Sequence, residues 1–266
     1  PVPQAWHRAK HAATTDGSVV NRVSVPAPAD VQLKAVRDGW LGATAVAGTP
    51  IAHVRRVAAT HNVVQDEKQR PTAEVGGVYT YEAIAPCTLA GRILLRGSLA
   101  RRIAAAAGWR QALSGRCRVG RSKKDDYGSA TFTITGDPAA LARPPSPGPR
   151  LVVWLESDVL LRDERLRPDT SMSGLCQALA RALDPDGSRG VAVAPADADR
   201  GSFTRVRRTE SWQQSWGLPR PSLVGLQAGS CFAFAVTGSL GAADLARVQA
   251  AGLGERTAEG YGQVSF

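Results

Sequence analysis

Alternating apolar and polar positions in the first half of the chain predict two strands, a helix and a hairpin, in that order. Strand-like runs cover residues 78–84 and 89–95, with a proline-containing turn between them. An alanine-rich run at 98–109 begins with a serine, has a glycine near its end, and predicts a helix. The segment 115–136 alternates on both sides of a charged, glycine-flanked centre. This is typical of a long β-hairpin, or of two strands with a large loop.

The second half of the chain continues the alternation of strands and helices. The expected elements are a strand at 150–163, a helix at 169–183, a strand at 230–238, a short helix from about 242 and a final strand at 261–266. Strand–helix–strand units therefore occur at least twice. This order predicts an α+β fold in which helices pack on an antiparallel sheet, of the ferredoxin-like (RRM-like) type.

The first 52 residues lack this regularity. Prolines exclude long helices there, at positions Pro1, Pro3, Pro26, Pro28 and Pro50. We therefore predict that residues 1–52 form a connector, or the tail of a preceding domain, and that residues 53–266 form one domain. With 43% hydrophobic residues in a chain of 266, a sizeable core is expected.

The net positive charge of the chain indicates which class of partner it binds. Lysine and arginine total 33 against 23 aspartates and glutamates, so the net charge is +10 and the isoelectric point is about 10.1. An excess of this size favours a polyanion such as nucleic acid. Arginine supplies most of the excess and forms forked hydrogen bonds with phosphate, although a GC-rich genome produces the same bias.

Cysteine spacing and hydropathy exclude several other classes. The cysteines at 87, 117, 176 and 231 form no CxxC pair, which argues against a zinc ribbon or a disulfide scaffold. It suits reduced thiols in the cytoplasm, which is the location we predict. No apolar run approaches 18 residues, so no membrane partner is expected. We find no metal-ligand constellation and expect no metal or other cofactor.

A glycine-rich segment, GLGERTAEGYGQV, occupies residues 252–264. Four glycines surround Arg256 in it: Gly252, Gly254, Gly260 and Gly262. Amides without a Cβ beside them can approach phosphate closely, and the arginine adds charge, so this segment is a candidate RNA site. The alternative is two tight turns, one ending a helix and one opening a strand. A P-loop is excluded, because its glycines lie between a strand and a helix.

Two basic clusters are further candidates for RNA contacts. The first precedes Tyr127, which could stack on a base, and consists of Arg116, Arg118, Arg121, Lys123 and Lys124. The alternative is a solvated hairpin tip with local Lys–Asp pairs. The second cluster lies near Trp212 and Trp216 and consists of Arg205, Arg207 and Arg208. Its alternative is a pair of core tryptophans beside a solvated loop.

Two residues in a polar, charged stretch are weak catalytic candidates. His61 has basic neighbours in the sequence and could exchange a proton with a ribose 2′-hydroxyl. A hydrogen-bonding or solvated histidine is the favoured alternative, because no second histidine is placed beside it by spacing. Asp66 is a candidate for target-RNA cleavage, but a single aspartate in a charged loop is usually only solvated.

Three segments together resemble a known family. The pattern G-h-G-x5-G-h-G, with Arg256 among the five, resembles the glycine-rich loop of the RAMP superfamily of CRISPR-associated proteins. The segment RVGRSKKDDYGSATF, residues 118–132, and the segment PRPSLVGLQAGSCFAF, residues 219–234, resemble the Csx-ten family. This is the Cas-five-like subunit of type III-D effector complexes. The resemblance covers residues 53–266.

The resemblance implies a RAMP fold with a thumb-like insertion that binds CRISPR RNA in a ribonucleoprotein complex for antiviral defence. It implies binding of the repeat-derived 5′ handle, contacts with a Cas-ten-type and a Cas-seven-type subunit, and no chemistry by this chain itself. Target RNA is a further candidate partner. Two enzymatic alternatives stay open: an endoribonuclease that processes precursor CRISPR RNA through His61, and a backbone subunit that cuts target RNA through Asp66. Family members usually carry an additional N-terminal domain that residues 1–52 do not supply, so we expect a longer subunit.

Overall fold

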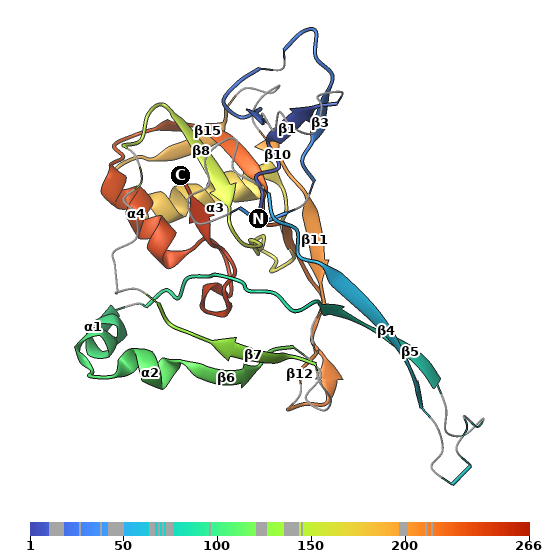
Figure 1. Cartoon of the computed structure of the whole chain (residues 1–266). Helices are drawn as coiled ribbons and strands as arrows, with labels where there is room; N and C mark the ends of the chain where they lie inside the picture. Colours follow the sequence, from blue (N-terminus) through green and yellow to red (C-terminus); the bar gives the residue numbers. More distant parts are fainter. Residues whose placement is uncertain are drawn as a thin grey trace. The chain divides into compact units, whose positions relative to one another are not determined.

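The described residues combine four α-helices with several small antiparallel sheets (Figure 1). The computed structural model describes residues 1–10, 19–26, 28–37, 39–41, 51–63, 67–68, 70, 72, 77–95, 97–120, 127–135, 144, 146–196, 202–210, 212–213 and 215–266. The chain divides into two compact units. The core unit comprises residues 1–52 and 140–266, and the hairpin unit comprises residues 53–139.

An antiparallel sheet of five strands organises the core unit. Strand β15 (Cys231–Thr237) pairs with β8 (Arg150–Leu155), and the register places Phe232 opposite Val153. The order is β10 (Ser202–Phe203), β15, β8 and β16 (Val264–Ser265), and β9 (Ala192–Pro195) also pairs with β15. The sheet therefore joins stretches that are far apart in the sequence.

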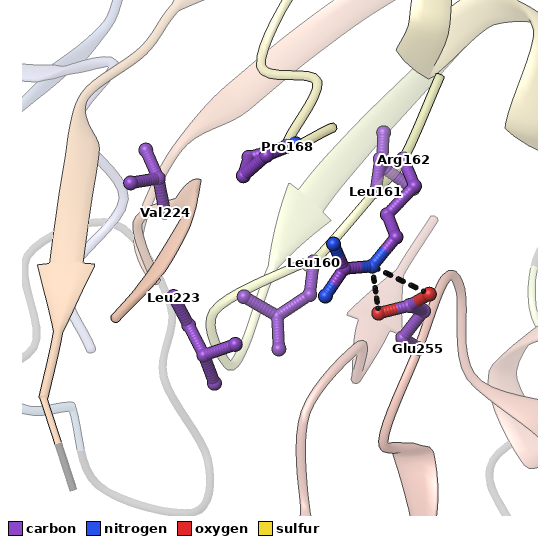
Figure 2. A pocket seen from close by; sticks show the side chains of 7 residues that line it. All are labelled: Leu160, Leu161, Arg162, Pro168, Leu223, Val224 and Glu255. Carbon is purple, nitrogen blue, oxygen red and sulfur yellow. Dashed lines mark hydrogen bonds and ion pairs between the residues drawn. The ribbon is translucent and has the colours of Figure 1, made fainter. Parts of the chain in front are cut away.

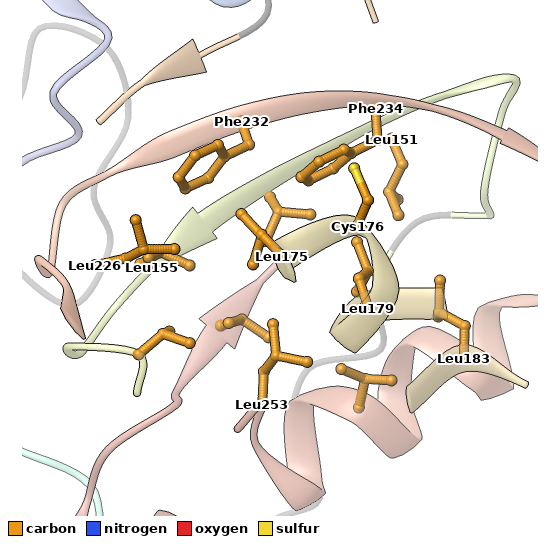
Figure 3. Packing of buried hydrophobic residues seen from close by; sticks show 14 of the residues in the cluster. Leu151, Leu155, Leu175, Cys176, Leu179, Leu183, Leu226, Phe232, Phe234 and Leu253 are labelled. Atoms are coloured by element: carbon orange, nitrogen blue, oxygen red, sulfur yellow. The ribbon is translucent and has the colours of Figure 1, made fainter. Parts of the chain in front are cut away.

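Two helices cover one face of this sheet (Figure 1). Helix α3 (Met172–Leu183) begins after Ser171, whose hydroxyl accepts the Gly174 amide at 3.0 Å and so caps the helix. Its buried residues follow helical spacing and are Leu175, Cys176, Leu179 and Leu183. Helix α4 (Ala242–Ala251) contributes Leu245 and Val248. Phe232 and Phe234 of β15 complete this core with stacked rings 6.0 Å apart (Figure 3).

The other face of β15 packs against the N-terminal residues. Because side chains alternate along a strand, Cys231 and Ala233 point away from the helices, and they form a second buried cluster with Ala5 and Val23. Nearby, β1 (Trp6–Ala9) is the middle strand of a sheet with β2 (Val20–Asn21) and β3 (Leu33–Ala35). Residues 1–52 thus share a compact unit with 140–266, whereas the predicted domain joined 53–139 to 140–266. Compact units and inherited domains need not coincide, so the domain boundaries stay a prediction.

Two short ribbons and a single turn complete the core unit. Strand β11 (Val206–Thr209) pairs with β14 (Leu223–Leu226), and β12 (Trp212–Gln213) pairs with β13 (Leu218–Pro219). On its other edge, β14 exchanges two backbone hydrogen bonds of 2.9 Å with Val159 through Leu226. The turn η1 (Thr257–Glu259) lies inside the glycine-rich segment.

The hairpin unit has paired strands and helices but almost no interior. Its elements are β4 (Arg56–Val63), β5 (Gly77–Ile84), α1 (Gly97–Ala105), α2 (Trp109–Leu113), β6 (Gly115–Arg118) and β7 (Ser129–Phe132). Strand β4 pairs with β5 over eight positions and β6 pairs with β7, both antiparallel. Ala85 is the one hydrophobic residue among those described in this unit that is buried.

Most predicted elements are present, with two corrections in the hairpin unit. The predicted strand at 89–95 is wrong: these residues form no strand, and the partner of β5 is β4. The predicted helix at 98–109 is interrupted, because Gly108 adopts a left-handed conformation with φ of 71° between α1 and α2. Across the described residues, we find no helix with the length and apolar character that a membrane span requires.

Candidate nucleic-acid interface

Positive charge is concentrated in the hairpin unit. Residues 53–139 contain 14 lysines and arginines against 7 aspartates and glutamates, which gives this unit +7 of the chain's net +10. The core unit, with roughly twice as many residues, carries the remaining +3. A basic excess concentrated in one unit is typical of a surface that attracts a polyanion.

The β4–β5 hairpin has two chemically different faces. Register places His61 opposite Tyr79 on one face, with Tyr81 two positions further along the same face. The opposite face carries a hydrogen bond of 3.1 Å between the hydroxyls of Thr60 and Thr80. It also carries an ion pair of 3.1 Å between Arg56 and Glu82, and both of these side chains are exposed. One face is thus aromatic and the other is polar.

Four rings meet on the aromatic face, and we call His61, Tyr79, Tyr81 and Tyr127 the aromatic cluster. His61 stacks on Tyr79 with centroids 5.4 Å apart and an interplanar angle of 17°. Tyr81 contacts Tyr79 edge-on at 5.1 Å. Tyr127 joins from outside the hairpin, with its hydroxyl 3.1 Å from His61 Nε2 and its ring 5.9 Å from Tyr81. Edge-on and offset contacts of this kind are the favoured geometries of aromatic pairs.

The structure brings together two residues that the sequence analysis named separately, and it adds two that it missed. His61 and Tyr127 are 66 positions apart, so their contact follows only from the fold. Tyr79 and Tyr81 were not predicted as site residues. The signal was present as the alternating run Y-T-Y, which places two aromatic rings on the same face of any strand.

The β6–β7 hairpin carries the first basic cluster beside this aromatic face. Arg116 and Arg118 are two positions apart in β6 and therefore share a face. The pairing continues beyond β6, because the Val119 amide donates to the Gly128 carbonyl at 2.8 Å. Tyr127 directly precedes Gly128 in the sequence, so this end of the hairpin lies beside His61 of β4. Of the predicted basic residues, Arg121, Lys123 and Lys124 lie outside the described residues.

The glycine-rich segment in the core unit forms two turns whose amides are largely used. All four of its glycines have positive φ, and Arg256 also has a φ of 55°. Four amides donate to backbone carbonyls: Gly252 to Val248, Leu253 to Gly262, Glu255 to Leu160, and Gly262 to Asp158. The Gly260 amide donates to Thr257 at 3.3 Å. The amides of Gly252, Gly260 and Gly262 are therefore engaged within the chain, which favours the tight-turn alternative, and the role of these glycines in RNA binding stays a prediction.

Close backbone packing explains why glycines are needed here. A Cβ at Gly254 would overlap the Leu160 carbonyl oxygen, and one at Gly262 would overlap the Leu253 carbonyl oxygen. On the other side of the same stretch, a Cβ at Gly225 would lie 2.6 Å from the Val159 oxygen. Glycines thus flank residues 159–160 on two sides. Tight turns, which the sequence analysis gave as the alternative, describe this packing. RNA binding through the side chains of the segment stays a prediction.

Charged side chains around the segment form a local network. Arg256 Nη1 lies 3.8 Å from Glu259 Oε2, and Arg220 Nη1 lies 3.6 Å from the same oxygen. Arg162 Nε contacts both carboxylate oxygens of Glu255 at 2.9 Å (Figure 2). Figure 2 shows this pair at the edge of a small pocket whose other lining residues are apolar: Leu160, Leu161, Pro168, Leu223 and Val224. The charged groups of the pocket are thus paired with each other.

The second basic cluster is also engaged by nearby acceptors. Arg205 Nη1 donates to the Arg37 carbonyl at 3.0 Å, and Arg207 Nη1 lies 3.8 Å from Asp158 Oδ2. Arg208 Nη2 contacts Glu210 at 3.0 Å and the Ser222 hydroxyl at 2.9 Å. Trp216 is 69% exposed, so the alternative in which both nearby tryptophans belong to a core is wrong for this residue.

Catalytic groups are sparse in the described structure. Among the described residues, no group of three or more His, Cys, Asp or Glu side chains is placed to hold a metal ion, and Asp66 lies outside those residues. All four cysteines are free thiols, two of them buried. Burial raises the pKa of Cys231 to about 11 and also raises the pKa of Cys176, so both thiols are poor nucleophiles.

Two comparisons of the sequence with known proteins were negative. A scan of the chain against protein-family models gives no match. A search of curated proteins gives no significant match.

Proposed function

We propose that this chain is an RNA-binding subunit with a ferredoxin-like RAMP fold, acting in a type III-D CRISPR effector complex in the cytoplasm. In this proposal it binds the repeat-derived 5′ handle of the CRISPR RNA. Its protein neighbours are the large Cas-ten-type subunit and the Cas-seven-type backbone subunit. Support for this family comes from the glycine-rich segment at 252–264 and the GRS…YG segment at 120–128.

One observation carries the RNA-binding part of the proposal: the hairpin unit holds +7 of the net charge of +10. Neutralising RNA phosphates with arginine and lysine releases counterions, which makes binding strong at low salt and independent of base sequence. Arg116 and Arg118 on one face of β6 are suited to such contacts. In the core unit, contacts would come from side chains such as Arg256, because the amides of Gly252, Gly260 and Gly262 already donate to backbone carbonyls.

Filter binding tests this proposal directly. We would measure the affinity of the chain for an RNA that carries the 5′ handle and for a scrambled RNA, over a series of salt concentrations. We expect tighter binding of the handle and a slope of log K against log[salt] of about −3 or steeper, which corresponds to four or more phosphate contacts. Equal binding of both RNAs would reject the CRISPR assignment. A flat salt dependence would reject RNA binding and favour a scaffold with protein partners only.

A metal-independent endoribonuclease is a second candidate, and the contact between His61 and Tyr127 favours it. A 3.1 Å contact between an imidazole nitrogen and a phenol places two proton-transfer groups side by side. Such a pair could accept the proton of a ribose 2′-hydroxyl, whose oxygen attacks the adjacent phosphorus. It could also protonate the 5′-oxygen that leaves. The products would be a 2′,3′-cyclic phosphate and a 5′-hydroxyl.

Cleavage of precursor CRISPR RNA in the presence of EDTA distinguishes the two candidates. The binding subunit is expected to leave the RNA intact in both wild type and His61→Ala. Cleavage by wild type that is lost in His61→Ala and reduced in Tyr127→Phe, with RNA binding retained, would establish the enzyme instead.

A further inference from the structure

We infer that the aromatic cluster of the hairpin unit is a stacking site for unpaired RNA bases. His61, Tyr79, Tyr81 and Tyr127 form one continuous set of ring contacts. Two of the rings remain accessible, since Tyr79 is 41% and Tyr81 is 39% exposed. This inference rests on the proposed RNA binding and adds the chemical group that is recognised.

A purely structural role accounts for only part of this arrangement. Cross-strand aromatic pairs do stabilise hairpins, and the stack of His61 on Tyr79 provides such a pair. Rings that serve only to build a core become buried, as Phe232 and Phe234 do at 1% and 0% exposure. The two tyrosines instead keep large exposed areas within a cluster that their neighbours already order. Ordered, exposed aromatic side chains are the usual surface on which bases stack.

The surrounding chemistry selects a nucleobase over an apolar protein segment. The cluster belongs to the unit with a net charge of +7. One of its rings, Tyr127, lies in the loop that joins β6 to β7, and β6 carries Arg116 and Arg118. Phosphates could contact the arginines while bases stack on the tyrosines, which is how many single-strand-binding surfaces work. The tyrosine hydroxyls and the histidine also offer hydrogen bonds to base edges.

The ligand is expected to be single-stranded. In a duplex the faces of the bases are covered by their neighbours, so a protein ring has no face to stack on. A stacked base contributes about a tenfold gain in affinity, judged from substitutions in other single-strand binders. With two exposed tyrosines, the affinity for a strand with bases should therefore exceed the affinity for the same strand without bases by about 10- to 100-fold.

The test compares a 12-nucleotide single-stranded RNA with its abasic counterpart, which has the same length and phosphate count, and with the matching 12-base-pair duplex, which has two backbones. Wild type is expected to prefer the single strand with bases over the abasic strand by at least about tenfold. In Tyr79→Leu/Tyr81→Leu this preference should disappear, while affinity for the abasic strand stays unchanged. Tyr79→Phe/Tyr81→Phe should keep the preference, because it keeps both rings. Thr80→Ala, on the opposite face of the same hairpin, is the matched control.

The outcomes separate this inference from the proposed function. Salt-dependent binding of the 5′-handle RNA by wild type, with equal affinity for the abasic strand, would overturn the stacking site alone. Absence of any RNA binding would overturn both. A loss of affinity for all three probes in the leucine variant, with the phenylalanine variant intact, would assign the rings a structural role and also overturn the stacking site.

Discussion

The two units of this chain contrast in how they use apolar residues and charge. The core unit buries a continuous cluster from β8, α3, β15 and α4 and carries a net charge of +3. The hairpin unit has one buried hydrophobic residue among those described and carries +7. Burial of apolar surface is the main source of folding free energy. The difference therefore indicates that the core unit supplies most of the stability, while a partner surface on the hairpin unit is our proposal.

Glycines show the same contrast at the level of single atoms. In the core unit, Gly225, Gly254 and Gly262 lie so close to other backbone atoms that a Cβ would clash. In the hairpin unit, a Cβ would meet no heavy atom within 4 Å at Gly77, Gly91, Gly97, Gly108, Gly115 and Gly120. Close backbone packing thus requires glycine at these three core-unit positions, whereas packing sets no such requirement at the six hairpin-unit positions.

The largest expected effect is on the core unit's aromatic centre. Phe234 is fully buried, so Phe234→Ala should lower the free energy of unfolding by about 3–5 kcal/mol through lost transfer energy and a cavity. Ile84→Ala in β5 truncates a side chain that is 56% exposed. It should change the free energy of unfolding by less than about 1 kcal/mol. Urea denaturation followed by circular dichroism measures both. Equal losses would show that the hairpin unit has a core of its own.

A second prediction separates packing from backbone conformation at glycine. Gly254→Ala combines a positive φ of 84° with overlap against the Leu160 carbonyl, and should cost about 3 kcal/mol in total. Gly108→Ala has a similar φ of 71° with open space around it, and should cost about 1 kcal/mol. Thermal unfolding of the two variants gives the comparison. A smaller loss for Gly254→Ala than for Gly108→Ala would contradict the close packing of the glycine-rich segment.

Burial patterns decide which elements the sequence predicts. Helix α3 and strand β15 were predicted correctly, because leucines at helical spacing and alternating phenylalanines leave a clear record of the face that is buried. The strand expected at 150–163 ends at Leu155, since Glu156 and Ser157 turn the chain toward the glycine-rich segment. The ferredoxin-like order of elements stays a prediction.

Elements that depend on strand pairing instead of burial show no clear hydrophobic pattern in the sequence. Strand β4 reads RVAATHNV, in which half of the residues are polar, and its conformation depends on eight paired positions with β5. For the same reason the run at 89–95 looks like a strand but lacks a partner strand among the described residues. The candidate site shows the same limit, because the contact of Tyr127 with His61 joins two hairpins that no local pattern links.

A third prediction concerns acid stability in the core unit. A hydrogen bond from Arg189, 2.7 Å from Asp244 Oδ1, lowers the pKa of this carboxyl below its usual value, and a second from the Gly241 amide adds to the effect. A carboxyl with a lowered pKa in the folded state stabilises the protein above its unfolded pKa. That stabilisation is lost as the pH falls through the lower folded value.

We therefore expect Asp244→Asn to lower the free energy of unfolding by about 1–2 kcal/mol at pH 7 and to flatten its decline below about pH 4. Glu82→Gln in the hairpin unit breaks an exposed ion pair and should change the free energy by less than about 0.5 kcal/mol. Urea midpoints measured from pH 7 to pH 2.5 provide the check. Parallel pH profiles for wild type and Asp244→Asn would contradict a role for this carboxylate.

The smallest expected effect tests whether charge in the two units is equivalent for RNA. Arg116→Ala on β6 should weaken binding of single-stranded RNA about three- to fivefold at 100 mM salt and reduce the salt slope by about 0.7, the value for one phosphate contact. Arg165→Ala makes the same change of charge on an exposed loop of the core unit and should leave the slope unchanged. Both variants differ from wild type by one unit of net charge, so a general effect of charge would lower their slopes equally. Equal slopes would therefore remove the distinction between a supporting unit and an RNA-binding unit.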